Sequence, residues 1–317
     1  MDNFSISNHH LHTDLAVEAR DIVRGATGKE ISGVSEEQQS FPYGSVTIIK
    51  ILDENAEKVM GRPKGTYITI EAPELKFKSP EAQQSVAGVL AQHLKNILNL
   101  NGQETILIIG LGNRQATPDA LGPSVVQNTL ITRHLFQYMP EAVENYQSVC
   151  AIAPGVLGIT GIETAEIIRG VVEKVQPSRI IAIDALAAAN ISRLGTTIQI
   201  GDNGIAPGSG VNNRRTEINQ QTMGVPVIAI GVPTVVNAAL IAKLALDTYF
   251  EKFSQGQYHP VYIQETVRDV IEPFQGQLVV TPREIDDLIQ NAAQTINRGI
   301  TMAVHQRIPE DELEALI

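Results

Sequence analysis

Two aspartates follow segments that are typical of buried strands, and both are candidates for acid–base chemistry. Asp184 comes directly after the apolar run 179–183, and Asp119 lies in a loop of prolines and glycines after the apolar run 105–109. In open α/β sheets, ligands gather at the carboxyl ends of the strands, so we expect the two carboxyl groups to lie close together. Two carboxyl groups that share a proton can act as base and acid on one water molecule. The pair therefore indicates hydrolysis of an amide.

Each aspartate also has a purely structural interpretation. Asp119 follows Thr117 and Pro118, which is typical of a helix N-terminus, where an acidic side chain interacts favourably with the helix dipole. Asp184 is similarly placed to accept hydrogen bonds from the backbone N–H groups of a following helix. Its apolar neighbours disfavour the charged carboxylate and are expected to raise its pKa. The spacing of the residues leaves both interpretations open.

A glycine-containing loop precedes Asp119 and is a candidate for substrate binding. Gly110, Gly112 and Asn113 follow the apolar run directly, and glycine lets a backbone turn sharply and approach a ligand closely. The loop is not a complete dinucleotide fingerprint, because Gln115 stands where the last glycine is needed and no acidic residue follows about 20 positions later. A non-catalytic nucleotide- or peptide-binding protein that uses this loop is an alternative to the enzyme.

Two further loops could contact a substrate. Gly155 follows the apolar run 148–153, and the glycine-rich stretch 201–210 contains Gly208 and Ser209. Both loops can be read as substrate-binding segments or as exposed connections. We take Gly155, Gly208 and Ser209 as candidate substrate-binding residues.

The composition excludes several classes of protein. The chain has 317 residues with 24 Lys+Arg and 35 Asp+Glu, and this net charge of −11 disfavours a protein that grips nucleic-acid phosphates. A single cysteine, Cys150, rules out an internal disulfide and a cysteine-based zinc site. His9, His10 and His12 lie in a polar N-terminus, where we expect them to be solvated. No signal peptide or segment of about 20 apolar residues is visible, so we expect a cytoplasmic protein.

Short apolar segments alternate with helical ones along most of the chain, which predicts a parallel sheet covered on both faces. Strands are expected at 45–52, 66–71, 105–109, 148–153, 179–183, 196–200, 225–230 and 277–280, and helices at 80–98, 122–138, 163–175 and 235–250. A last helix is expected to open at Thr281, with Pro282 and Glu284 completing a capping box. The prediction is a three-layer α/β/α fold with a mainly parallel sheet and a small N-terminal β-rich extension.

Seven ordered motifs run through the chain: GLGN at 110–113, ATPDALGP at 116–123, TRHLF at 132–136, APGV at 153–156, GITGIET at 158–164, AIDALAA at 182–188 and GVPTVV at 231–236. Together with TDLAVE at 13–18, they closely resemble the germination protease family. Members of that family are endopeptidases that degrade small acid-soluble spore proteins. The resemblance extends from residue 13 to the C-terminal helix.

The resemblance implies an aspartic-type endopeptidase with a fold like that of hydrogenase maturation proteases. It places the two catalytic residues on Asp119 and Asp184, with neither metal nor cofactor, and implies a homotetramer in the spore core. A metal-dependent peptidase of the hydrogenase maturation type is the nearest alternative. Ala189, Ala206 and Asn237 stand where relatives have Arg, His and Asp, and the region 250–277 is shorter than theirs.

The resemblance also implies self-processing. Family members are made as zymogens that remove their own propeptide, and they cut spore proteins after an acidic residue in the motif Thr or Ser, Glu, an apolar residue, Ala. The sequence TDLA at 13–16 mimics this motif, which implies a cut between Asp14 and Leu15. Residues 1–14 would be the propeptide, and 15–317 a single peptidase domain made of a β-rich extension at 15–75 and an α/β core at 76–317.

Overall fold

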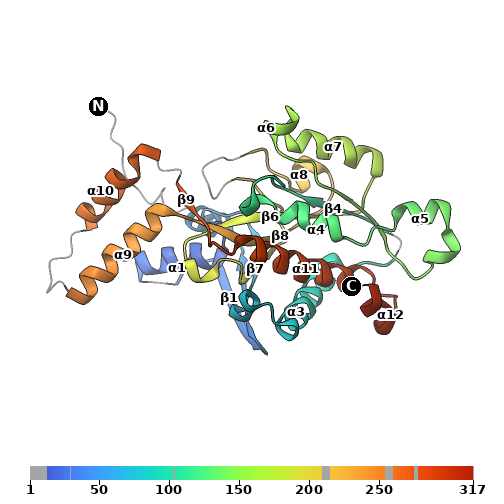
Figure 1. The fold of residues 1–317 in the computed structure, drawn as a ribbon, viewed down its shortest axis with the longest axis horizontal. Coiled ribbons are helices and arrows are strands. Elements are labelled where there is room, and N and C mark those ends of the chain that lie inside the picture. The colour runs from blue at the N-terminus through green and yellow to red at the C-terminus, as the bar shows by residue number, and fades with distance from the viewer. Residues whose placement is uncertain are drawn as a thin grey trace.

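The structure is a computed structural model that describes residues 13–316 except 29, 103, 209–214, 254–259 and 275–277. Within these residues, nine strands form one sheet (Figure 1). They are β1 (Val34–Phe41), β2 (Gly44–Ile51), β3 (Gly65–Glu71), β4 (Thr105–Gly110), β5 (Ser148–Ile152), β6 (Arg179–Ala188), β7 (Thr197–Gly201), β8 (Val227–Asn237) and β9 (Val279–Val280). Their order is β1-β2-β3-β7-β8-β6-β4-β5, and β9 pairs with β8.

Four neighbouring strands form the parallel part of the sheet. β4 pairs in parallel with β5 and with β6, and β6 pairs in parallel with β8. The apolar runs of these strands are buried on both faces: Ile106 and Ile108 belong to one core cluster, and Leu107 and Ile109 belong to another. This is the burial that continuous apolar strands predict.

The remaining pairings are antiparallel, so the sheet is mixed and not mainly parallel, and the parallel arrangement is confined to the half of the sheet that ends at β5. β1, β2, β3 and β7 form successive antiparallel pairs, and β7 pairs antiparallel with β8. The N-terminal strands are not a separate layer, because Ile68 and Ile70 of β3 share one apolar core with Ile198 and Ile200 of β7. The α/β class is confirmed, with the N-terminal part continuing the central sheet.

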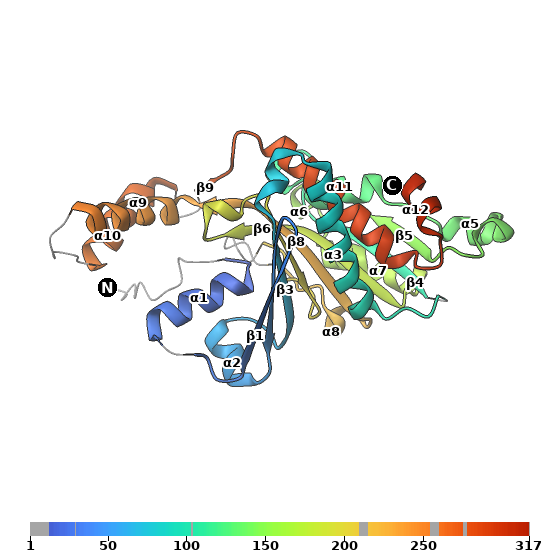
Figure 2. The same ribbon diagram turned by 90° about the horizontal axis from the view of Figure 1, so that it is seen from below.

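Helices cover both faces of the sheet and complete three layers (Figure 2). One face carries α3 (Pro80–Leu98), α4 (Leu121–Asn128) and α11 (Ile285–Val304), and α3 and α11 pack side by side. The other face carries α1 (Ala16–Thr27), α2 (Glu54–Met60), α7 (Thr164–Val175) and α8 (Gln220–Met223). The shorter helices are α5 (Arg133–Tyr138), α6 (Leu157–Thr160) and α12 (Glu310–Leu316).

Two helices extend away from the body beyond the end of β8 (Figures 1 and 2). They are α9 (Ala238–Phe253) and α10 (Pro260–Ile271), and they pack on each other through a small apolar cluster of their own. α9 begins three residues later than the sequence predicts, because β8 continues to Asn237. In the described part of the chain, no helix combines the length and the apolar character that crossing a bilayer would require.

The helix expected at 122–138 is two helices, α4 and α5. The break contains Thr132, which is buried and holds the chain against β5: its backbone N–H donates to the Val149 carbonyl at 3.0 Å, and its hydroxyl donates to the Gln147 carbonyl at 2.5 Å. These contacts with a distant strand override the local helical pattern.

The capping box expected at 281 is wrong. The hydroxyl of Thr281 donates to the Thr234 carbonyl of β8 at 2.8 Å, and α11 begins only at Ile285. Thr281 therefore ties the approach to α11 to the sheet instead of capping the helix.

Candidate active site

A cavity of about 990 Å³ opens beside the parallel strands and is lined by both candidate aspartates. Asp119 reaches it from the loop after β4, and Asp184 reaches it from within β6. Thr13 and Asp14, more than 100 residues earlier in the chain, also line it. The fold thus brings three acidic or polar segments to one place.

The loop after β4 is built around Gly112 and Asp119. The backbone N–H of Asn113 donates to the Asp119 carboxylate at 2.8 Å and to the Asp119 carbonyl at 3.0 Å. Gly112 has φ +108°, and a Cβ atom there would lie 2.1 Å from the Asp119 carbonyl oxygen. The N-cap of α4 is Ala120, so the Asp119 carboxylate binds its own loop and does not cap that helix.

Asp184 lies inside β6, which continues to Ala188, and not at the end of a strand as the sequence predicts. Its side chain is buried, and its Oδ1 accepts a hydrogen bond from the Ala185 backbone N–H at 2.9 Å. A helix does not follow Asp184 directly, so the capping interpretation of this residue is wrong.

The surroundings of both carboxyl groups favour their protonated forms. Burial raises the pKa of Asp184 well above its usual range, and the neighbouring carboxyl groups of Asp119 and Asp14 raise it further. Burial also raises the pKa of Asp119, although the hydrogen bond from Asn113 opposes this. Both shifts favour the protonated form, so the pair is suited to hold a proton, as acid–base catalysis by carboxyl groups requires.

The N-terminal segment is seated against β6 at the edge of the cavity. The Asp14 backbone N–H donates to the Ala187 carbonyl at 2.8 Å, and the Ala187 N–H donates to the Asp14 carboxylate at 2.8 Å. Arg62 donates to the Thr13 carbonyl, and the side chain of Leu15 is fully buried. Both sides of the Asp14–Leu15 bond are thus fixed in place.

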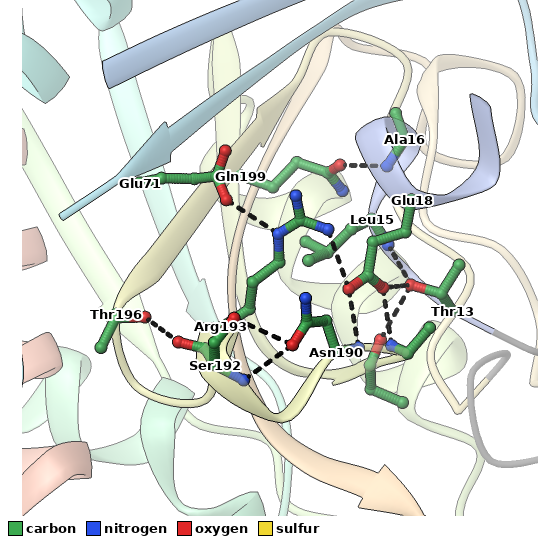
Figure 3. Close-up of polar contacts among 12 residues, drawn as sticks. Thr13, Leu15, Ala16, Glu18, Glu71, Asn190, Ser192, Arg193, Thr196 and Gln199 are labelled. Carbon is green, nitrogen blue, oxygen red and sulfur yellow. Dashed lines mark hydrogen bonds and ion pairs between the residues drawn. The ribbon is translucent and has the colours of Figure 1, made fainter. Parts of the chain in front are cut away.

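A buried ion network fixes the helix that follows this segment (Figure 3). The Glu18 carboxylate accepts hydrogen bonds from the backbone N–H groups of Ala189 at 2.6 Å and Asn190 at 2.9 Å. Arg193 pairs with Glu18 at 3.0 Å and with Glu71 at 2.8 Å. α1 is therefore locked to the loop after β6, so the segment before it has little freedom to move.

Not every candidate substrate-binding residue lines the cavity. Gly112, Asn113, Gly155 and Gly208 do. Gly110 instead packs against the start of α4, where a Cβ atom would lie 2.2 Å from the Gly122 carbonyl oxygen. Ser209 and the histidines at 9, 10 and 12 lie outside the described residues.

Gln199 is a cavity residue that sequence reasoning missed. It lies in β7 between Ile198 and Ile200, and its side chain contacts the Asp14 carbonyl and the Ala16 backbone N–H, the second of which is drawn in Figure 3. A polar residue within an apolar strand was the only signal for it in the sequence.

A family model described as germination protease matches residues 12–260 and 256–316, which together span nearly the whole chain. The chain belongs to the germination protease family. It is therefore a peptidase, and the family name places its activity in spore germination. The resemblance stated from the motifs is confirmed.

Individual germination proteases match over almost their full lengths. The protein of Caldanaerobacter subterraneus subsp. tengcongensis is 46% identical over 97% of this chain and 98% of its own. The protein of Clostridium perfringens (strain ATCC 13124) is 41% identical over 98% and 99%, and that of Priestia megaterium is 38% identical over 98% of each chain.

Among solved structures, a [NiFe] hydrogenase maturation protease from Thermococcus kodakarensis KOD1 aligns with 66% of this chain and 98% of its own, at 15% identity and a TM-score of 0.34. A TM-score at this level does not establish a common fold. The expected likeness to hydrogenase maturation proteases stays a prediction.

Proposed function

We propose that this germination protease is an aspartic-type endopeptidase that starts the degradation of small acid-soluble spore proteins. The observation that carries the proposal is the pair of carboxyl groups, Asp119 and Asp184, in one cavity that also receives Asp14. A buried carboxyl pair that shares a proton can activate water and protonate a leaving amine without a thiol or hydroxyl nucleophile.

The two aspartates have different roles in this proposal. Asp184 is the more buried of the two, and other carboxyl groups face it, so it holds the proton and acts as the acid. Asp119 is half-buried and accepts a backbone hydrogen bond that favours its charged form, so it acts as the base on water.

We further propose that the chain processes itself between Asp14 and Leu15, with residues 1–14 as the propeptide. The segment is seated at the cavity edge by the Ala187 and Arg62 contacts, which supports a cut within the same molecule. The TDLA sequence of this segment is similar to the motif that the family cleaves in spore proteins, with Asp14 in place of Glu.

A homotetramer in the spore core, without direct binding to nucleic acid, completes the proposal. The net charge of −11 fits a protease that takes protein substrates and not the duplex they coat. Exposed apolar side chains on α9 and α10, among them Leu244, Tyr249 and Phe253, fit an interface between subunits.

The test of the carboxyl pair is self-processing by the full chain. Incubation at mildly acidic pH, followed by mass spectrometry of the N-terminus, is expected to show a product that begins at Leu15. Asp119→Asn and Asp184→Asn should each slow this cut by about 10³-fold or more, because each removes one half of the acid–base pair. Asp311→Asn, an exposed aspartate on α12, is the matched control and should cut normally.

Full activity in either site variant would refute the two-aspartate assignment, and a product with another first residue would refute the processing site. The metal-dependent alternative predicts loss of the cut in a chelator, with recovery when metal is returned. The proposed mechanism predicts a cut that is unchanged by the chelator.

A further inference from the structure

We infer that Gln199 is a catalytic residue that hydrogen-bonds the carbonyl group of the peptide bond to be cut and stabilises the negative charge formed there. This inference rests on the proposed self-cleavage at the Asp14–Leu15 bond and adds a third residue to the carboxyl pair. It is carried by the contacts of one side chain and the register of three strands.

The Gln199 side chain spans the bond in question. Its Nε2 donates to the carbonyl oxygen of Asp14 at 2.8 Å, and its Oε1 accepts from the backbone N–H of Ala16 at 2.7 Å (Figure 3 shows the second contact). The Asp14 carbonyl is the one attacked when the Asp14–Leu15 bond is hydrolysed. A donor at this distance lies within the range expected for stabilising an oxyanion.

The orientation of the Gln199 amide follows from its partners. The Ala16 N–H can only donate a hydrogen bond, and the Asp14 carbonyl can only accept one. Reversing the amide would place two donors together on one side and two acceptors together on the other. The NH₂ group of Gln199 must therefore face the Asp14 carbonyl.

Gln199 and Asp184 lie in register with each other across three adjacent strands of the sheet. Gly231 of β8 is the register partner of Asp184 in β6 and also of Gln199 in β7. Register partners on adjacent strands point to the same face, so the two side chains project to one side, with Cα atoms about 10 Å apart across two strand spacings. Gly231 has no side chain and lines the cavity, and the Leu186 side chain packs over it, since a Cβ atom there would lie 2.5 Å from Leu186.

The proposed hydrolysis uses the carboxyl pair, Asp119 and Asp184, to accept and to supply the protons. Water attacks the Asp14 carbonyl carbon and gives a proton to Asp119, while the carbonyl electrons move to the oxygen that Gln199 holds. The C–N bond then breaks as Asp184 gives its proton to the Leu15 nitrogen. The products are a new carboxyl group on Asp14 and a free amine on Leu15, and the pair still holds one proton, now on Asp119.

A competing role for Gln199 is purely structural. Ala16 is the first residue of α1, so its N–H is one of the free donors at a helix N-terminus, and Oε1 satisfies it. In that case the Nε2 contact would only help to seat the segment. The two roles differ in which half of the amide is needed for the cut.

Two substitutions in the full chain separate these roles. Gln199→Glu keeps an acceptor for Ala16 but replaces the donor that faces Asp14, and Gln199→Met is a neutral side chain of similar length with neither group. Thr197→Val is the matched control, because Thr197 is buried in the same strand, projects to the same face, and has a hydroxyl with no hydrogen-bond partner. The rate constant of the self-cut and the melting temperature are measured for each.

We expect both Gln199 variants to cut about 10²-fold more slowly or worse, as loss of an oxyanion donor does elsewhere, and Thr197→Val to cut at the wild-type rate. Hydrogen exchange of residues 13–20 in an Asp119→Asn background, where the chain stays intact, reports whether the segment is still seated. Slow cutting with retained protection of the Asp14 amide supports the catalytic role.

Two outcomes would overturn the inference: either Gln199 variant cutting within threefold of the wild-type rate, or slow cutting with the protection of the Asp14 amide lost. Each leaves the proposed function standing as long as Asp119→Asn is inactive. Normal cutting by Asp119→Asn would instead refute the proposed function itself, so the two failures are distinguishable.

Discussion

Asp184 is a carboxylic acid in a position where its charge is poorly solvated. It is buried inside β6, it receives one backbone hydrogen bond, and its charged neighbours are other carboxyl groups. Such a site favours the neutral acid, and the folded protein loses stability when the group ionises. The proposed role of Asp184 as the protonated acid therefore predicts a measurable effect on stability.

Replacing Asp184 with Asn should stabilise the fold at neutral pH. The pKa of Asp184 is raised on folding, so stability is fully present below the pKa of the unfolded chain and is lost as pH rises through the folded pKa. Asn has the same shape and does not ionise. We expect the variant to melt at a higher temperature than the wild type at pH 7, with the difference shrinking towards pH 4.

The matched control is Asp311→Asn, whose difference from the wild type should be small and should not grow with pH. Thermal melts at intervals between pH 4 and pH 8 measure both. A variant that is less stable than the wild type at pH 7 would show that the Asp184 carboxylate is well accommodated, which contradicts its assignment as the protonated acid.

The site residues that could be predicted from the sequence are those marked by their local surroundings. Asp119 and Asp184 each follow an apolar run, so their place beside the parallel strands could be read from the sequence, although Asp184 lies within β6 and not at its end. Gln199 could not be found in this way, because its role depends on the register of β7 against β8 and on a segment almost 190 residues earlier. Glu18 was missed for the same reason: its partners in the loop after β6 are set by the fold.

At the scale of single elements, the loop between β4 and α4 is the most constrained part of the site. Gly112 adopts a backbone conformation that favours glycine, and the Asp119 carbonyl lies where a Cβ atom would be. The position of the Asp119 carboxyl group, the proposed base, therefore depends on a residue that has no side chain.

Gly112→Ala is expected to displace this loop. The clash with Asp119 and the positive φ should reduce the free energy of unfolding by about 1–3 kcal/mol and slow the self-cut, because Asp119 cannot keep its position. Gly158→Ala is the control, since Gly158 lines the same cavity in α6 with an ordinary φ and open space around it. Equal cutting rates in the two variants would contradict this account of the loop.

Elements with strong local patterns were predicted well, and elements fixed by distant contacts were not. α3 matches its predicted bounds, because an apolar stripe and a Ser79 N-cap define it locally. β1 was missed because its side chains are almost all exposed and polar, and pairing with β2 alone makes it a strand. The break at Thr132 and the late start of α11 come from hydrogen bonds to β5 and β8, which no local pattern reveals.

At the scale of the whole molecule, α9 and α10 form an arm with more apolar surface than a single chain can bury. Leu244 is 53% exposed and Phe253 is 72% exposed, although both belong to α9, which already packs on α10. A neighbouring subunit of the proposed tetramer would cover such a surface.

The double variant Leu244→Glu with Phe253→Glu should therefore reduce the mass of the assembly measured by light scattering. Leu52→Glu with Phe77→Glu is the matched control, because it places the same charges at an equally exposed leucine and phenylalanine on the body. We expect the arm variant to give smaller species at micromolar concentration while the control keeps the wild-type mass. An unchanged mass in the arm variant would remove α9 and α10 from the interface.

The seating of residues 13–16 at their own cavity also predicts the kinetics of the proposed self-processing. A cut within the same molecule is a first-order reaction, so its rate constant does not depend on protein concentration. The uncut form should therefore disappear with one half-life and no lag. A cascade, in which each activated molecule activates others, would instead begin slowly and then accelerate. In this proposal the half-life of the uncut form depends on the protonation of the carboxyl pair within each molecule. Dilution of the protein should leave that half-life unchanged.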